Sequence, residues 1–122
     1  MGNILVVDDN EDMCQIISDV LRTEGNTVEI ACDGESALSE LKRKTYDLMV
    51  LDYRLFDMNG LEVLEKLKGI TLPLYTIMIS AYGSEPVKAR ARELEVHEFF
   101  DKPFDVNALL KVVKKALCKK AD

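Results

Sequence analysis

The sequence predicts an α/β protein built on a doubly wound, five-stranded parallel sheet with five helices. Short apolar runs alternate with amphipathic helical patterns along all 122 residues, and such alternation is typical of parallel strands joined by right-handed crossovers. No linker, repeat or low-complexity segment interrupts it. Two of the apolar runs end in aspartates, which places acidic side chains at the sheet edge where ligands bind in open α/β folds.

The strands are predicted from short runs rich in Val, Ile, Leu and Phe. Five such runs occur, at residues 3–7, 27–31, 47–51, 75–80 and 98–100. We expect them to pair in the flavodoxin-like order 2-1-3-4-5, with the third strand at the centre of the sheet.

The helices are predicted from apolar spacing and from residues that start or stop a helix. In residues 11–24, apolar side chains recur at i, i+3, i+4, i+7 and i+8, and Gly25 follows as a stop. The other four helices are bounded by capping, first-turn or stop residues: Asp33-Gly34 before the second, Asn59 and Gly69 around the third, Ser84-Glu85-Pro86 at the start of the fourth, and Asp105 before the fifth.

Length and composition narrow the class of protein. We expect residues 1–122 to form one domain that folds without disulfides, because the three cysteines are odd in number and far apart. No apolar run approaches the ~18 residues of a membrane span, and no secretory signal precedes the first strand. The sequence therefore predicts a cytoplasmic protein without membrane contact. A net charge of −6 argues against direct nucleic-acid binding.

Three aspartates are predicted to share one pocket. Asp8 and Asp9 follow the apolar run 4–7, and Asp52 follows the run 48–51. Because parallel strands deliver their carboxyl ends to one edge of the sheet, we expect these carboxylates to lie close together. Neighbouring carboxylates repel one another, and a divalent cation keeps all of them ionised. Oxygen-only ligands indicate Mg²⁺, with Mn²⁺ as the second candidate ion.

Two further side chains are predicted at the same edge. Lys102 follows the fifth strand and Ser80 ends the fourth. Carboxylates, a lysine and a hydroxyl around one strand edge suit a phosphoryl group carried on, or passing through, a carboxylate. Asp52 is the candidate nucleophile because it comes from the central strand, and Gly60 lets the following loop turn closely past it.

These residues resemble the receiver domains of bacterial two-component response regulators. The family's motifs are an acidic pair after the first strand, an aspartate ending the third with a glycine eight residues on, Ser or Thr followed by Ala after the fourth, and Lys-Pro after the fifth. They read here as Asp8-Asp9, Asp52 with Gly60, Ser80-Ala81 and Lys102-Pro103. The resemblance covers essentially the whole chain.

The resemblance implies a signalling role. Asp52 would accept a phosphoryl group from the phosphohistidine of a histidine kinase or a phosphotransfer protein. The chain would catalyse its own phosphorylation and dephosphorylation without being an enzyme that acts on other substrates. Its output would pass to a downstream effector domain or protein, with a phosphorylation-dependent dimer as a further expectation.

The resemblance also implies roles for individual residues. Asp9 and Asp52 would hold Mg²⁺ directly, Asp8 directly or through water, and Arg54 through its backbone carbonyl. Lys102 would bind a phosphoryl oxygen. Ser80 would move to hydrogen-bond another phosphoryl oxygen. Phe99 would be the switch aromatic that turns inward when Ser80 moves. The output surface would be the fourth helix, fifth strand and fifth helix.

Some positions depart from the family pattern or carry a further expectation. Phe56 stands where a proline is common, so we expect an altered loop. Glu95 stands where glycine is common before the fifth strand, and Phe99 replaces the commoner tyrosine. Arg54 and Tyr82 are expected to flank the path of water to the phosphorus and to lengthen the life of the phosphorylated form.

Other polar residues are expected to have structural roles. We interpret Asp33, Asp47, Asp57 and Asp105 as helix-cap or turn residues. His97, the only histidine, is interpreted as a surface residue because no second histidine or cysteine stands near it to complete a metal site.

Two alternative functions remain open. A metal-dependent phosphohydrolase with an aspartyl-phosphate intermediate is disfavoured because Arg54 occupies the place of its second acid. A phosphorylation-independent interaction module usually lacks an acid or the lysine, and both are present here. A flavin-nucleotide binder is disfavoured because Asp8, Asp9 and Asn10 replace the hydroxyl-rich phosphate loop that it needs.

Overall fold

The computed structural model describes residues 2–68, 75–81 and 83–121, with side chains as far as Cys118. Helices and strands alternate along the chain in ten elements: β1 (Asn3–Val7), α1 (Glu11–Thr23), β2 (Thr27–Ala31), α2 (Gly34–Arg43), β3 (Leu48–Asp52), α3 (Gly60–Lys66), β4 (Tyr75–Ser80), α4 (Glu85–Glu93), β5 (Glu98–Asp101) and α5 (Val106–Ala121).

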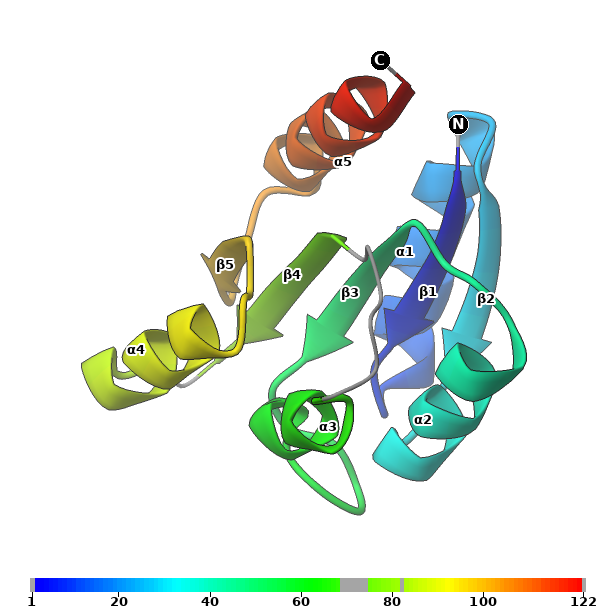
Figure 1. The fold of residues 1–122 in the computed structure, drawn as a ribbon. Helices are drawn as coiled ribbons and strands as arrows, with labels where there is room; N and C mark the ends of the chain where they lie inside the picture. Colours follow the sequence, from blue (N-terminus) through cyan, green and yellow to red (C-terminus); the bar gives the residue numbers. More distant parts are fainter. Residues whose placement is uncertain (1, 69–74, 82, 122) are drawn as a thin grey trace.

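The five strands form one parallel sheet in the order β2-β1-β3-β4-β5, which runs from right to left in Figure 1. The predicted doubly wound, flavodoxin-like fold is therefore confirmed. All five residues of β3 are buried, as expected for the central strand of a sheet covered on both faces.

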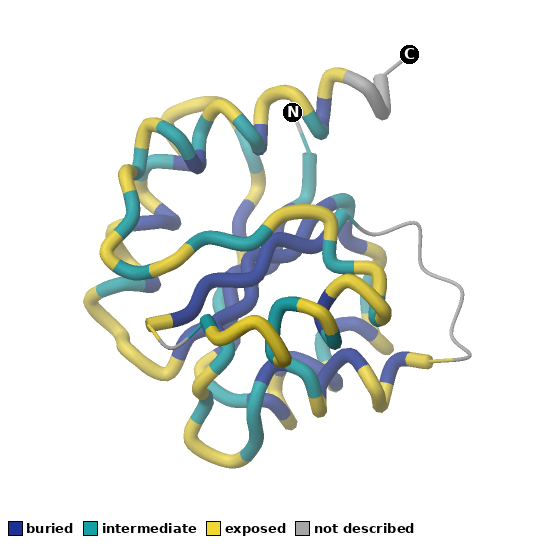
Figure 2. Tube along the Cα trace, turned by 90° about the vertical axis from the view of Figure 1, so that its left-hand side faces the viewer, coloured by how far each residue is buried: buried dark blue, intermediate teal, exposed yellow. Residues whose placement is uncertain are grey.

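Helices pack on both faces of the sheet, and side chains that alternate along each strand enter two separate cores. Ile4 and Val6 pack with residues of α1 and α5, whereas Leu5 and Val7 pack with residues of α2, α3 and α4. In Figure 2 the buried strands occupy the middle of the molecule and the exposed residues lie on the outer sides of the helices.

The structure corrects several predicted boundaries. β3 covers Leu48–Asp52, one residue later than the predicted 47–51, because Asp52 still pairs with Ile79 of β4. β5 extends to Asp101, which pairs with Ser80. The first helix ends at Thr23 with Glu24 as its cap, and α3 ends at Lys66. The predicted stop of the third helix, Gly69, lies outside the described residues.

Helix caps fix where the loops leave the sheet. Asn10 and Asp33 accept hydrogen bonds from the backbone N–H groups of Met13 and Ser36, and Asn59 forms a reciprocal capping box with Glu62. These caps start α1, α2 and α3 within a few residues of the strand ends. Within the described residues, none of the helices has both the length and the apolar character of a membrane span.

Candidate metal site at the carboxyl edge of the sheet

The sheet brings the three predicted aspartates together. Asp8 and Asp9 follow β1, and Asp52 ends the neighbouring strand β3. One carboxylate oxygen from each residue lies within 4.8 Å of the others. Asp8 and Asp52 are buried, whereas Asp9 is exposed. The two buried carboxylates form the floor of the site and Asp9 lies on its open side.

Lys102 provides a positive charge beside these carboxylates. Its Nζ donates a hydrogen bond to Asp52 Oδ2 at 3.0 Å and lies 4.0 Å from Asp8 Oδ2. The backbone N–H of Lys102 donates to the carbonyl of Ser80 at 2.8 Å. This bond continues the β4–β5 pairing past the end of β5 and holds Lys102 at the edge of the sheet.

Burial and neighbouring charge act against ionisation of Asp8. Several causes together raise its pKa to about 7; burial is the largest of them, and the nearby Asp52 carboxylate acts in the same direction. The N–H of Asn10, which donates to Asp8 Oδ1 at 2.9 Å, lowers the pKa, as does Lys102. The charge of Lys102 does not offset the burial of the Asp8 carboxylate, so a divalent cation would stabilise the site further.

These residues surround a cavity of about 370 Å³ lined by Asp8, Asp9, Asn10, Asp52, Arg54, Leu55, Ala81 and Lys102. A water molecule occupies ~30 Å³ in the liquid, so the cavity has room for a hydrated metal ion and a phosphoryl group. The side chains at the acidic end offer oxygen ligands without nitrogen or sulfur, the set that suits Mg²⁺ or Mn²⁺. The residues present therefore fit such an ion.

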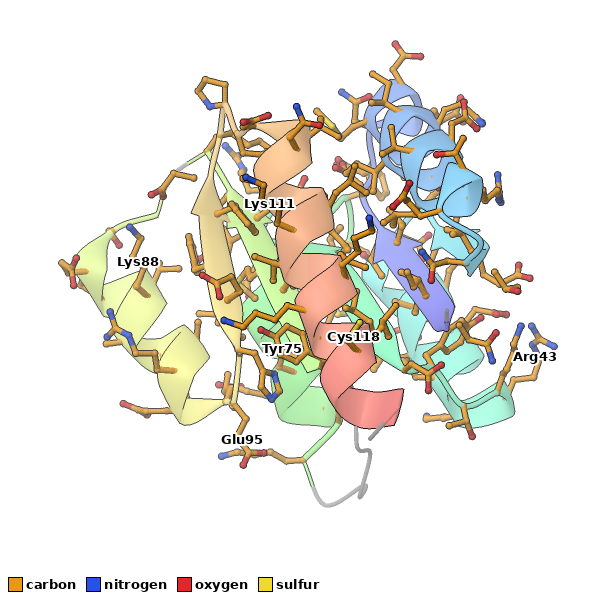
Figure 3. The ribbon with its side chains drawn as sticks, turned by 90° about the horizontal axis from the view of Figure 1, so that it is seen from above. Arg43, Tyr75, Lys88, Glu95, Lys111 and Cys118 are labelled. Carbon is orange, nitrogen blue, oxygen red and sulfur yellow. The ribbon has the colours of Figure 1, made fainter. Side chains whose placement is uncertain are left out.

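Ser80 and Phe99 occupy the next strands along the same edge. Ser80 is fully buried at the end of β4 and pairs in the sheet with Asp101. Phe99 is half-buried on β5, and the ammonium of Lys88 on α4 lies 5.4 Å from its ring centroid. Lys88 also pairs with Asp101 at 3.1 Å; Figure 3 labels it on α4, beside β5. Contacts thus connect Ser80 with α4 through Asp101.

Asp57 acts as a helix cap, one of its two predicted roles, but the helix that it caps is distant in the sequence. Its carboxylate accepts the N–H groups of Gly34 at 2.7 Å and Glu35 at 3.0 Å, so it caps the start of α2 from the loop after β3. The hydrogen bond from Gly34 is the main cause that lowers the pKa of Asp57. The contact spans more than twenty residues, and no local sequence pattern indicates it.

The other residues with expected structural roles have identifiable partners. Asp33 caps α2, Asp105 accepts the N–H of Asn107 at 2.9 Å, and Asp47 accepts the N–H of Asn3 at 2.8 Å. His97 is exposed, as expected, but it also accepts the N–H of Thr76 at Nδ1 and stacks on Tyr75 with 4.4 Å between ring centroids. Tyr82 lies outside the described residues.

Known proteins share this sequence pattern and fold. The family model of the response regulator receiver domain matches residues 4–114. Sporulation initiation phosphotransferase F of Bacillus subtilis is 32% identical over 114 residues, which cover 93% of this chain and 92% of that protein. The transcriptional regulatory protein ZraR of Salmonella typhimurium is 30% identical over 115 residues. That match covers 94% of this chain but spans about a quarter (26%) of the length of ZraR.

Solved structures agree with this relationship. A response regulator receiver domain protein (CheY-like) from Methanospirillum hungatei superposes with a TM-score of 0.93 at 27% identity, covering 99% of this chain and 97% of that one. A two-component response regulator from Clostridium difficile has the same TM-score of 0.93 at 22% identity and full coverage of both chains, and supports the fold alone. The family match, the relatives and the fold together show that the chain belongs to the response regulator receiver domains of two-component systems.

Proposed function

We propose that the chain is a phosphorylation-dependent switch in which Asp52 accepts a phosphoryl group from a phosphohistidine. The observation that carries this proposal is the position of Asp52, with the ammonium of Lys102 at 3.0 Å and the carboxylates of Asp8 and Asp9 around the same small volume. A carboxylate between a cation and a divalent-metal site is well placed to attack phosphorus. The donor is a histidine kinase or a histidine phosphotransfer protein.

The chemistry is a displacement at phosphorus. A carboxylate oxygen of Asp52 forms the new P–O bond while the P–N bond to the donor imidazole breaks, and the bonding electron pair leaves with the imidazole nitrogen. Lys102 is placed to pair with a phosphoryl oxygen as its contact with Asp52 is exchanged. Since the nucleophile is already positioned beside Lys102, the chain contributes mainly orientation and charge.

The acidic residues would hold the metal ion. We propose that Asp9 and Asp52 bind it directly, Asp8 directly or through water, and Arg54 through its backbone carbonyl. When bound, Mg²⁺ or Mn²⁺ would neutralise the negative charge of the carboxylates and the phosphoryl group. The raised pKa of Asp8 supports this assignment, because burial disfavours its charged form until a cation lies beside it.

The switch would run from Ser80 to the surface of α4, β5 and α5. Phosphorylation adds negative charge and acceptor oxygens next to Ser80, which we propose moves toward them. Phe99 then changes position. The contacts of Asp101 with Ser80 in the sheet and with Lys88 on α4 offer a continuous route for this change. Downstream effectors, or a second copy of the chain in a phosphorylation-dependent dimer, would recognise that surface.

Arg54 would help to set the lifetime of the phosphorylated form. It is exposed on the wall of the cavity that holds Asp52, where its guanidinium can pair with the phosphoryl group and restrict water. Tyr82 is proposed to act with it, although its position lies outside the described residues. The phosphohydrolase alternative is not favoured, because Arg54 occupies the place where such an enzyme carries its second acid.

Incorporation of phosphate from acetyl phosphate tests this proposal without a protein donor. We expect labelling in the presence of Mg²⁺ and its loss in excess chelator, with Asp9→Asn strongly reduced because a metal ligand is removed. Asp19→Asn, on the exposed face of α1, is the matched control and should label like the unaltered chain. Labelling that needs neither metal nor Asp9 would contradict the proposal.

A further inference from the structure

Phe56 is unusually exposed for an aromatic side chain. Of the large apolar side chains in the described part of the chain, two are exposed: Ile16 at 51% and Phe56 at 89%. Single exposed apolar residues are common on protein surfaces, so exposure alone does not assign a role. Two further observations concern the loop that carries Phe56: hydrogen bonds fix its backbone, and the residues directly before Phe56 line the cavity around Asp52.

The loop holds Phe56 at the tip of a defined turn. The N–H of Leu55 donates to the carbonyl of Met58 at 3.1 Å, and Arg54 and Asn59 form an antiparallel bridge below it. Asp57, next to Phe56, binds the two N–H groups at the start of α2. The turn is therefore fixed at its base and on one side. Binding would order the ring of Phe56 but not the backbone that carries it, and a preorganised backbone lowers the conformational cost of using the ring as an anchor.

The turn stands at the rim of the cavity around Asp52. Arg54 and Leu55, which precede Phe56 directly, both line that cavity. A protein that brings a phosphohistidine to Asp52 must cover the rim, whereas a small donor such as acetyl phosphate enters without touching it. Phe56 is thus placed to distinguish a protein donor from a small molecule.

The rest of the rim indicates the chemistry of the partner. Glu11 and Asp12, which directly follow the cavity-lining Asn10, are exposed in the first turn of α1. A partner that covers both parts of the rim would place an apolar depression over Phe56 and basic side chains over these acids, since complementary charge guides association.

We propose that Phe56 is the apolar anchor of the surface on which the phosphohistidine-bearing donor protein docks. This inference rests on the proposed function, because it concerns the donor of the phosphoryl group that Asp52 accepts. The occupant is a donor protein with an apolar depression flanked by basic residues.

Phosphotransfer kinetics test the anchor. The probe is the purified, autophosphorylated histidine kinase that transfers fastest to the unaltered chain, chosen from the kinases of the same genome. We expect Phe56→Asp to lower kcat/KM for this transfer by about tenfold or more, while labelling by acetyl phosphate stays within about twofold. Phe56→Leu keeps an apolar side chain and should retain most of the transfer rate.

Thr45→Asp is the matched control, because it adds the same charge at an exposed position of the α2–β3 loop, at the opposite edge of the sheet. It should leave both reactions unchanged.

Unchanged kinase transfer in Phe56→Asp would overturn the proposal that Phe56 is an anchor. An equal loss of labelling with acetyl phosphate would overturn it too, because that result would place Phe56 in the chemistry of the site. If Phe56→Asp instead dissociates a dimer in sedimentation and leaves transfer intact, a second copy is the occupant. Failure of the unaltered chain to label from either donor would contradict the proposed function itself.

Discussion

The ammonium of Lys102 donates a 3.0 Å hydrogen bond to the carboxylate of Asp52. Asp52 is buried and Lys102 is half-buried, so the pair is partly shielded from solvent. Water competes less for such a contact than for an exposed ion pair. A hydrogen bond to a charged group contributes about 1.5–3 kcal/mol to the free energy of unfolding. The same ammonium adds positive charge next to the proposed metal ligands.

Lys102→Met should separate the contact of the lysine with Asp52 from the effect of its charge on the metal. We expect labelling of the chain by acetyl phosphate to slow by about tenfold or more, since a charge-assisted contact is lost. Mg²⁺ should bind more tightly, because a neighbouring positive charge has been removed. Lys66→Met, on the exposed face of α3, is the control. Unchanged Mg²⁺ binding in Lys102→Met would show that the charge of the lysine does not act on the metal, and weaker binding would contradict the expected direction.

Asp8 should make the stability of the metal-free protein depend on pH. Its folded-state pKa is raised from 3.8 to about 7, so the folded state binds more protons than the unfolded state between these values. The free energy of unfolding should therefore fall as the pH rises through this window. In Mg²⁺ titrations, affinity should decrease below about pH 7, because protons compete with the metal.

Urea unfolding of the unaltered chain and of Asp8→Asn, each at about pH 6 and about pH 8, isolates the contribution of Asp8. The variant should lose less stability over this range than the parent. An identical change in the free energy of unfolding of both proteins would show that ionisation of Asp8 does not destabilise the folded state.

Replacement of Glu95 with glycine should stabilise the protein. Glu95 follows α4, before β5 (Figure 3), and has a φ of 67°, a conformation that is unfavourable for a residue with a side chain. Glu95→Gly should raise the free energy of unfolding by about 1 kcal/mol. Glu95→Ala removes the carboxylate and keeps Cβ, so it should gain little. Equal gains in both variants would assign the effect to the carboxylate instead.

Ser18 carries a buried hydroxyl in α1 for which the described residues provide no hydrogen-bond partner. Ser18→Ala removes the cost of that desolvated group and should stabilise the protein by about 1 kcal/mol in urea unfolding. Alanine also favours helices, so the exposed Ser39→Ala in α2 serves as the control for helix propensity. A smaller gain at Ser18 than at Ser39 would show that its hydroxyl is satisfied.

Local sequence patterns predicted the strands, and the choice of a flavodoxin-like strand order then predicted the meeting of the three aspartates. Each apolar run is followed directly by its acidic residues, and parallel pairing then brings those ends together. Glu95 could be singled out because it replaces a common glycine, and its positive φ explains why glycine suits that position. The membership of the family was predicted from the same strand-end motifs.

Contacts between residues far apart in the chain were not predictable in this way. Asp57 has an ordinary turn context, yet its partners lie at the start of α2. Lys88 and Asp101 meet only because α4 packs beside β5. The end of β3 was misplaced by one residue because backbone pairing with β4, and not side-chain polarity, decides where the strand stops.

Chemical mapping of the phosphorylated residue tests the central claim most directly. Borohydride reduces an aspartyl phosphate to homoserine, so the unaltered chain, treated with acetyl phosphate and Mg²⁺ and then reduced, should contain homoserine at position 52 in peptide mass spectra. Asp52→Asn should remain unmodified. Homoserine at position 8 or 9 in the unaltered chain, or phosphate that survives borohydride, would contradict the assignment of Asp52 as the phosphoacceptor.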